Sequence, residues 1–116
     1  MDIESIQEFV KKLPGVSEDI KWEHHLCFLV GGKMFAIVDL NDVPLGITFK
    51  TTAEQFAELV NHSHITAAPY LGRSHWVFLD DMNQMPKSVL QDHLVAAYKL
   101  IAAKLPTKTK KELGLQ

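Results

Sequence analysis

The sequence predicts an α+β fold in which an antiparallel sheet carries its helices on one face. Three observations lead to this prediction. Helical periodicity occurs near both ends and once in the middle, apolar runs typical of strands lie between these segments, and a Gly-Gly pair joins two of the runs. Strands connected by short turns form antiparallel sheets, and helices that do not alternate with parallel strands pack on one side of them. We expect a single domain over residues 1–116, because a chain of this length buries a self-sufficient core.

The first helix is predicted to begin after Asp2, whose side chain suits the N-cap position. Helical spacing relates its apolar positions, which are Ile3, Ile6, Phe9, Val10 and Leu13. Pro14 and Gly15 end the helix, because proline disfavours helical backbone in the residue before it. A polar loop is expected over residues 17–19, ahead of Trp22.

A β-hairpin is predicted next. Apolar runs over residues 25–30 and 33–40 flank Gly31-Gly32, and glycine accepts the positive φ that tight hairpin turns require. The second run is apolar at both alternating sets of positions, so both of its faces require cover. Either the C-terminal tail or the loop at Trp22 folds over the face that the helices leave free, or a ligand or partner occupies it.

A third strand is predicted over residues 45–50, after a turn at residues 41–44. Side chains alternate between the two faces of a strand, so Ile47 and Phe49 point the same way, towards the helices. The opposite face of the sheet is then expected to carry Met34, Thr48, Lys50 and Trp76.

The second half of the chain is predicted to add two helices and two strands. Thr52 and Gln55 form a capping box ahead of the first of these helices. Its apolar stripe comprises Ala53, Phe56, Ala57 and Val60. A short strand is expected over residues 65–68 and a second one over residues 75–80, with Pro69 as the break between them.

The last helix is predicted to begin at Pro86, since proline suits the first helical turn. Its buried stripe consists of Leu90, Leu94, Ala97, Ile101 and Leu105. The helix ends at Leu105-Pro106, where proline again disfavours helical backbone before it. The lysine-rich segment that follows is expected to be a solvated tail.

Charge is distributed unevenly along the chain. The net charge of −2 argues against a strongly basic nucleic-acid binder. From Lys99 onward, however, five lysines stand against one glutamate, which gives this tail +4 and leaves −6 for the residues before it. The single cysteine, Cys27, excludes an internal disulfide framework. No apolar run is long enough to span a bilayer and no signal sequence opens the chain, so we expect a cytoplasmic protein.

No motif for catalysis or metal binding is complete. His24 and His25 are adjacent, so as neighbours on a strand they are expected to point to opposite sides and not to share an ion. His62 and His64 follow a helix, where a loop could bring them together, but no nearby ligand completes their set. Cys27 lies in an apolar run and is expected to be an inert buried thiol. We therefore expect no enzyme activity, no cofactor and no bound metal.

Residues 67–77 form the segment richest in residue types that bind ligands. Arg73 is the only arginine of the chain, and it follows Gly72 and precedes Trp76 within this segment. Arginine and aromatic side chains are typical of binding surfaces. The segment is therefore interpreted as a binding edge of the sheet.

Six stretches of the chain resemble the MmcQ/YjbR family, in the order in which that family carries them. They are Leu13-Pro14-Gly15-Val16, Gly32-Lys33-Met34-Phe35-Ala36, Ile47-Thr48-Phe49-Lys50, Ala68-Pro69-Tyr70-Leu71-Gly72-Arg73-Ser74-His75-Trp76-Val77, Ala97-Tyr98-Lys99-Leu100-Ile101 and Lys104-Leu105-Pro106. The resemblance covers nearly the whole chain and implies a CyaY-like α+β fold, related in shape to frataxin. It also implies a DNA-binding protein. The positions that match the family pattern are Lys33, Lys50, Tyr70, Gly72, Arg73 and Trp76.

Two main hypotheses for the function follow, beside a third in which His62, His64 and a residue from elsewhere in the chain form an enzymatic or metal-carrier site. In the first, a non-enzymatic module binds DNA through the free sheet face and the Gly72–Trp76 loop. Phosphate contacts are assigned to Lys33, Lys50 and Arg73, and stacking contacts to Tyr70 and Trp76. In the second, the same face binds a protein or a small ligand through apolar contacts, independently of salt and with an aromatic anchor.

Overall fold

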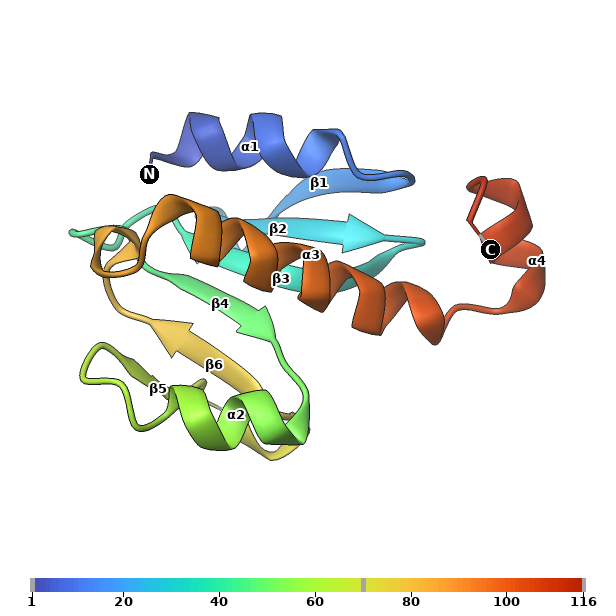
Figure 1. Cartoon of the computed structure of the whole chain (residues 1–116). Helices are drawn as coiled ribbons and strands as arrows, with labels where there is room; N and C mark the ends of the chain where they lie inside the picture. Colours follow the sequence, from blue (N-terminus) through green and yellow to red (C-terminus); the bar gives the residue numbers. More distant parts are fainter. Residues whose placement is uncertain (1, 70, 116) are drawn as a thin grey trace.

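The computed structural model describes residues 2–69 and 71–115, and its centre is a six-stranded antiparallel sheet (Figure 1). The strands run β1 (Val16–Lys21), β2 (His25–Val30), β3 (Lys33–Asp39), β4 (Ile47–Lys50), β5 (Ile65–Ala67) and β6 (Trp76–Leu79), in the spatial order β1-β2-β3-β4-β6-β5. The helices are α1 (Ile3–Lys11), α2 (Ala53–Leu59), α3 (Lys87–Ala103) and α4 (Thr107–Glu112), with short 3-10 turns η1 (Gly72–Ser74) and η2 (Met82–Gln84). The predicted α+β class is confirmed.

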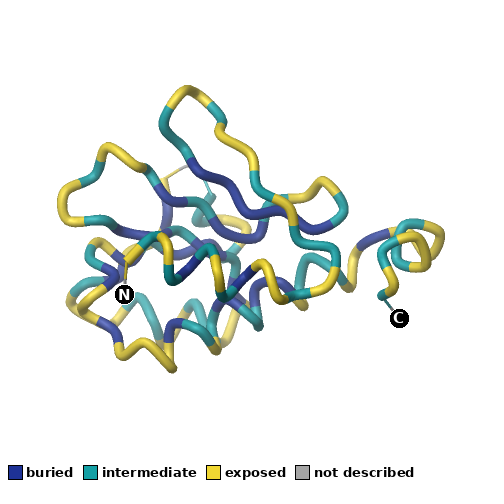
Figure 2. The backbone as a smooth tube through the Cα atoms, turned by 90° about the horizontal axis from the view of Figure 1, so that it is seen from above, coloured by how far each residue is buried: buried dark blue, intermediate teal, exposed yellow. Residues whose placement is uncertain are grey.

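Helices α1, α2 and α3 lie on one face of the sheet (Figures 1 and 2). The core fills the space between the two layers, where Phe28, Phe35 and Phe49 of the strands meet Leu90 and Leu94 of α3, all five fully buried. Burying such a side chain away from water contributes about 1.5–3 kcal/mol to the stability of the fold. The helices leave the other side of the sheet free, and we call this side the open face.

Local signals in the sequence mark the element boundaries correctly. The carboxylate of Asp2 accepts a hydrogen bond from the Ser5 amide at 2.8 Å, which caps α1. Thr52 and Gln55 exchange two hydrogen bonds of 3.1 Å, so the predicted capping box of α2 is present. Both residues of the Gly31-Gly32 turn have positive φ, 58° and 78°, as the predicted hairpin requires.

The polar loop expected over residues 17–19 is wrong, because these residues belong to β1. This strand pairs with β2 along its whole length, from Val16 opposite Val30 to Lys21 opposite His25. Polar side chains suit β1 because it is an edge strand with one side open to solvent. The backbone hydrogen bonds from β2 form whatever side chains β1 carries. The sequence of β1 therefore needs no alternation of apolar and polar residues and does not show it clearly.

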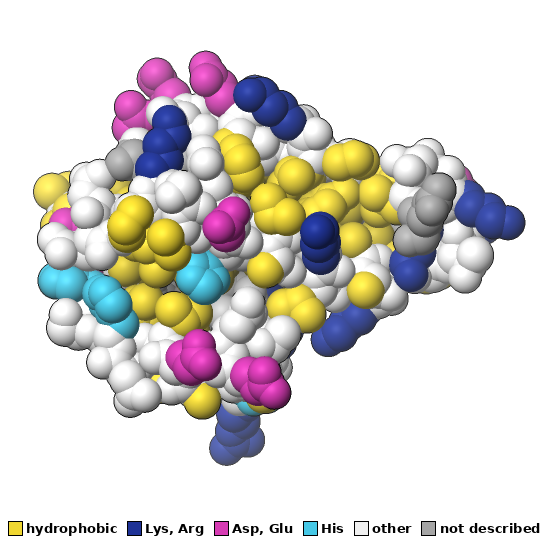
Figure 3. Space-filling view, in the orientation of Figure 1, with side chains coloured by type: hydrophobic (Ala, Val, Ile, Leu, Met, Phe, Trp, Pro, Cys, Tyr) yellow, Lys and Arg dark blue, Asp and Glu magenta, His cyan; other side chains and the backbone are white. Residues whose placement is uncertain are grey.

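The C-terminal segment folds into a short helix that the sequence analysis does not predict, while Lys108 and Lys111 stay exposed, as expected of a solvated segment. Pro86 is the N-cap of α3, so the helix begins at Lys87, one position after the predicted start, and it ends at Ala103, before the short helix α4. Leu113 packs on Gly15, where an added Cβ would lie 3.2 Å from the Leu113 Cβ. Hydrophobic side chains gather beside α4 on the helix-covered side (Figure 3). Among the described residues, no helix is long and apolar enough to cross a membrane.

A β-bulge decides which side chains of β3 reach the open face. The β2–β3 register shifts after Phe28, so that Phe28 lies opposite Ala36 and Leu29 lies opposite Met34, with Phe35 as the extra residue. Phe35 and Ala36 are both fully buried in the core. Met34 is partly buried and lines a hollow on the open face. The bulge thus explains why β3 is apolar without strict alternation.

Candidate binding site on the open face

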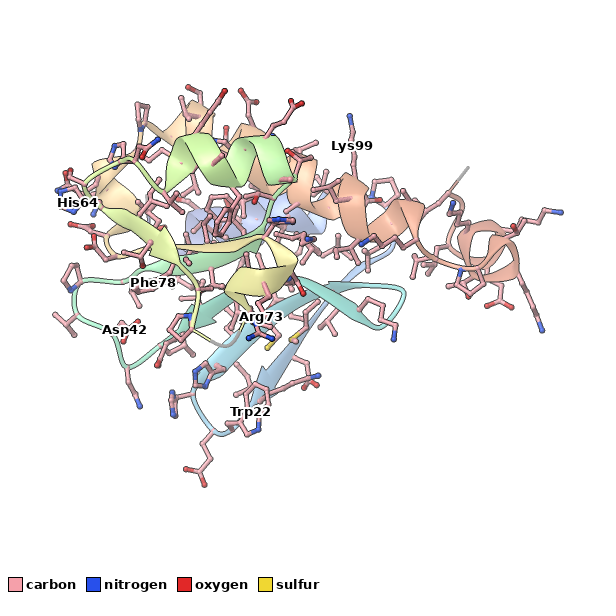
Figure 4. All side chains as sticks on the ribbon, turned by 90° about the horizontal axis from the view of Figure 1, so that it is seen from below. Trp22, Asp42, His64, Arg73, Phe78 and Lys99 are labelled. Carbon is pink, nitrogen blue, oxygen red and sulfur yellow. The ribbon has the colours of Figure 1, made fainter. Side chains whose placement is uncertain are left out.

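The segment between β5 and β6 folds over part of the open face. The amide of Ala68 donates to the Trp76 carbonyl at 3.0 Å, and the amide of Leu71 donates to the Ala68 carbonyl at 3.2 Å. His75 closes η1 with a left-handed backbone, φ 61°, so β6 begins at Trp76 and not at the predicted residue 75. Figure 4 shows Arg73, on this segment, and Trp22 on the side of the sheet that faces away from the helices.

An apolar hollow lies between this segment and the sheet, and we call it the sheet-face hollow. It has a volume of about 460 Å³ and is lined by Trp22, His25, Met34, Ile37, Thr48, Ala68, Pro69 and Leu71. The strands supply its floor, and the β1–β2 turn and the β5–β6 segment supply its walls. The indole of Trp22 is 67% exposed, which is unusual for so large an apolar side chain. The volume falls within the range of small-molecule sites.

Thr48 and Lys50 lie on the open side of β4, as predicted, because Ile47 and Phe49 are fully buried in the core. Across the β4–β6 ladder, Thr48 lies opposite Phe78 and Lys50 lies opposite Trp76.

A narrower apolar slot lies where β3 separates from β4, and we call it the lysine slot. It has a volume of about 300 Å³ and is lined by Lys33, Met34, Trp76, Ile101, Lys104, Leu105 and Pro106. Lys33 and Lys104 are exposed and carry their charges at its rim. The slot therefore combines apolar walls with a cationic entrance.

The Lys50 ammonium group is already engaged by the protein. It donates a hydrogen bond to the Ser74 carbonyl, and the neighbouring Thr51 hydroxyl donates to the His75 carbonyl at 2.7 Å. Burial, and to a lesser degree the charge on Lys104, lowers the pKa of Lys50. Lys50 therefore ties the β5–β6 segment to β4, and a phosphate would have to compete with the Ser74 carbonyl for it.

The remaining predicted site residues are only partly brought together. Trp76 is 8% exposed, so its ring forms a wall of the lysine slot and is not a free stacking surface for a base. Arg73 is exposed and makes no hydrogen bond or ion pair with the described residues, but it lines neither the hollow nor the slot. Gly72 allows a close approach, since an added Cβ would lie 3.1 Å from the Ala67 Cβ. Tyr70 lies outside the described residues.

The expectation that His24 and His25 diverge is wrong. His24 Nδ1 lies 2.7 Å from Asp39 Oδ1, and His25 Nε2 lies 3.6 Å from Asp39 Oδ2, so both rings approach one carboxylate. Strand alternation does not apply to this pair, because β2 begins at His25 and His24 belongs to the preceding turn. The signal for this turn is Trp22-Glu23, where both residues have positive φ.

The other histidine pair is organised differently. His64 Nδ1 lies 2.9 Å from Asp80 Oδ1, and the His64 amide donates to His62 Nδ1 at 3.2 Å. One ring of the pair is thus paired with a carboxylate and the other with the backbone. Cys27 is fully buried, and burial raises the pKa of its thiol, which favours the inert thiol over the nucleophilic thiolate.

A third hollow, of about 500 Å³, lies between α1 and β1. Its lining is more polar, because Gln7 Nε2 donates to Glu18 Oε2 at 3.0 Å and Asp19 also reaches it. Ile20 lies at its edge and is half exposed. This hollow combines fewer apolar walls with internal hydrogen bonding, so the sheet-face hollow is the better site for an apolar ligand.

Comparison with known proteins identifies the family. The family model described as YjbR matches residues 11–100. A crystal structure of a Deinococcus radiodurans protein with a DUF419 domain superposes with a TM-score of 0.88 at 26% identity, covering 98% of this chain and 88% of that one. A crystal structure of a Pseudomonas syringae protein gives 0.72 at 17% identity, with 87% and 99% covered, and shares the fold. No curated protein matches the sequence. Since the family model covers most of its length, the chain belongs to the YjbR family.

Proposed function

We propose that the protein is a non-enzymatic binding module that seats a largely apolar ligand in the sheet-face hollow. The observation that carries the proposal is the hollow itself, whose walls come from two loops and whose floor comes from Ile37 and Thr48 of the sheet. Met34 adds an adaptable apolar side chain, and such side chains are common on surfaces that accept varied ligands. A ligand that replaces water against these walls gains free energy in proportion to the apolar area buried.

Binding is favoured over catalysis by the state of the reactive groups. Among the described residues, no serine, threonine or cysteine side chain is hydrogen bonded to a histidine ring, which is the usual arrangement of an activated nucleophile. The Cys27 thiol lies below the open face with a raised pKa. The hollow thus offers contact area and a few polar groups at its edge, which suits recognition.

The proposal predicts that a neutral apolar dye binds in the hollow and that a charge placed in its wall removes this binding. With N-phenyl-1-naphthylamine as the probe, we expect Leu71→Asp to weaken binding at least about tenfold, because an apolar ligand would leave the new carboxylate without a partner. Binding by the unaltered protein should not change between about 50 and 200 mM salt, since no phosphate or other charge is neutralised. Dye fluorescence at increasing protein concentration measures the affinity of the Leu71→Asp variant and the salt dependence of the unaltered protein.

Val89→Asp is the matched control, because Val89 is an exposed apolar residue of α3 outside the hollow. This variant should bind the dye as the unaltered protein does. Equal loss in Val89→Asp and Leu71→Asp, or no loss in Leu71→Asp, would show that the dye binds elsewhere and would overturn the proposal.

A second candidate function, DNA binding, is favoured by the cationic groups around the lysine slot. Lys33 and Lys104 line it, Lys50 is close enough for the Lys104 charge to affect its pKa, and Arg73 has no partner among the described residues. Four cations at one end of a protein with a net charge of −2 form a small electrostatic footprint. The family resemblance points to the same ligand.

Replacing Lys33 or Arg73 with alanine tests this candidate. If each side chain contacts a phosphate, each variant should weaken duplex binding and reduce the slope of log affinity against log salt by about 0.9. Polarisation of a labelled duplex measures the slope, and Lys87→Ala, at the start of α3, serves as the control of equal charge. Absence of salt-dependent binding at low salt, to duplex or single-stranded DNA, would contradict DNA binding and leave the apolar-ligand proposal in place.

A further inference from the structure

The turn between β1 and β2 brings two imidazoles and a carboxylate together at the edge of the sheet-face hollow. We propose that His24, His25 and Asp39 form a binding site for a divalent transition-metal ion of the Zn²⁺ or Ni²⁺ type. One donor atom from each of the three residues can be chosen so that all lie within 4.8 Å of one another. This site is additional to the proposed apolar ligand and does not depend on it.

Each histidine lies near the distance that a tetrahedral site requires from one oxygen of the Asp39 carboxylate. Zinc–nitrogen and zinc–oxygen bonds of 2.0–2.1 Å place neighbouring ligand atoms about 3.4 Å apart. His25 Nε2 and Asp39 Oδ2 are 3.6 Å apart, which matches this edge without any movement. His24 Nδ1 and Asp39 Oδ1 are 2.7 Å apart, a hydrogen-bond distance that opens by less than 1 Å when an ion replaces the shared proton.

Neither ring nitrogen of His25 has a hydrogen-bond partner among the described residues. Nδ1 is buried and has no hydrogen-bond partner within the described part of the chain, and Nε2 is too far from Asp39 for a hydrogen bond. Polar atoms in buried positions are normally hydrogen bonded, because an unpaired one costs about 1–3 kcal/mol. No hydrogen bond from the described residues therefore competes with a metal ion for this imidazole.

Backbone contacts hold the three residues in this arrangement. The Leu40 amide donates to the His24 carbonyl at 2.8 Å, which fixes the turn beside the end of β3. His25 and Asp39 lie directly opposite each other in the β2–β3 ladder. The Asn41 amide donates to Asp39 Oδ1 at 3.0 Å, and this bond is the main cause of the lowered pKa of Asp39. The carboxylate is therefore ionised and oriented before any ion arrives.

Two imidazoles and one carboxylate are ligands that suit zinc and its neighbours in the first transition series. Three protein ligands also leave a coordination position for water or for an external group. His25 lines the sheet-face hollow, and Asp39 and Asp42 line an adjoining cavity of about 180 Å³. The open position can therefore be reached from the open face.

Trp22 provides a direct readout of ion binding. Its ring packs edge-on against the His25 ring, with centroids 5.6 Å apart, so Ni²⁺ at the site should quench its fluorescence. We expect saturable quenching in the untagged full chain carrying Trp76→Phe, which leaves Trp22 as the sole tryptophan, and reversal of the quenching by Zn²⁺. His24→Asn and Asp39→Asn should each weaken Ni²⁺ binding more than about a hundredfold, because loss of an outer hydrogen bond alone costs about 10–100-fold.

His64→Asn is the matched control, because it removes a histidine–aspartate pair of similar geometry outside the site. Its Ni²⁺ affinity should equal that of the parent. Circular dichroism confirms that each variant is folded, and since Asp39→Asn also alters a turn, His24→Asn is the deciding variant. Absence of saturable quenching in the parent, unchanged affinity in folded His24→Asn, or a loss in His64→Asn as large as that in His24→Asn would overturn the proposal.

Discussion

Replacing Phe35 with alanine is expected to lower the free energy of unfolding by about 3–5 kcal/mol. The Phe35 side chain is fully buried, and its ring lies edge-on to Tyr98 of α3 at a centroid distance of 5.7 Å. It also contacts Phe28 of the neighbouring strand, at 6.5 Å. Truncation removes the apolar burial and leaves a cavity between sheet and helix. Small domains have about 5–15 kcal/mol of stability in total, so the expected loss is a large fraction of the free energy of unfolding.

Urea denaturation followed by circular dichroism measures this loss. Phe35→Leu should lose less, because it fills part of the cavity, and Val89→Ala, at an exposed position on α3, should stay within about 0.5 kcal/mol of the parent. A loss below about 1 kcal/mol for Phe35→Ala would mean that the layers collapse into the cavity. In that case the bulge that turns Phe35 inward and Met34 outward would not be rigid.

Gly46→Ala is expected to lower the free energy of unfolding by about 1–3 kcal/mol or more, because the added methyl group would collide with β6 beside its pairing with β4. An added Cβ would lie 2.5 Å from the Leu79 carbonyl oxygen and 2.8 Å from Cε1 of Phe78. Leu79 pairs with Ile47 in the ladder, so its carbonyl cannot move away without disturbing the β4–β6 pairing. The urea midpoint should fall, and amide hydrogens of β6 should exchange faster than those of β2.

Gly72→Ala is the matched control, because neither glycine has a positive φ and both lie close to another residue. Among the described residues, the added Cβ at Gly72 would lie nearest to the Ala67 Cβ, at 3.1 Å, and a shift of a few tenths of an ångström relieves this contact. Gly72→Ala should therefore be the milder change. Equal losses in the two variants would show that the Leu79 carbonyl is not the cause, because the reduced freedom of the unfolded chain in a Gly→Ala variant would by itself raise stability.

Local signals in the sequence were sufficient where the chemistry is local. Caps, capping box and glycine turn depend on residues within four positions of one another, and each is present as predicted. The edge strand β1 and the helix α4 were missed for the opposite reason. Both are stabilised by partners outside the segment itself, β2 for the strand and Gly15 for Leu113 beyond the helix. No periodicity within either segment reports such a contact.

The candidate site divides in the same way. The two-sided apolar character of β3 correctly indicated that its second face needs cover, and Trp22 was among the alternatives named for it. The principal cover, however, is the β5–β6 segment, whose sequence is typical of a binding edge. A segment rich in aromatic and polar residues resembles a ligand-binding loop. Some of these residues, however, pack against the sheet and cover part of its open face.

The sequence by itself determined the fold class, the hairpin and the family, because these depend on local periodicity, turn residues and the order of short motifs. Only the tertiary structure decided that Trp76 is buried, that Lys50 is tied to Ser74, and that His24 and His25 share Asp39. The physical reason is that exposure and convergence are set by pairing across the sheet, between residues far apart in the sequence such as Lys50 and Trp76, which are 26 positions apart. Such distances are fixed by packing, which no single stretch of sequence encodes.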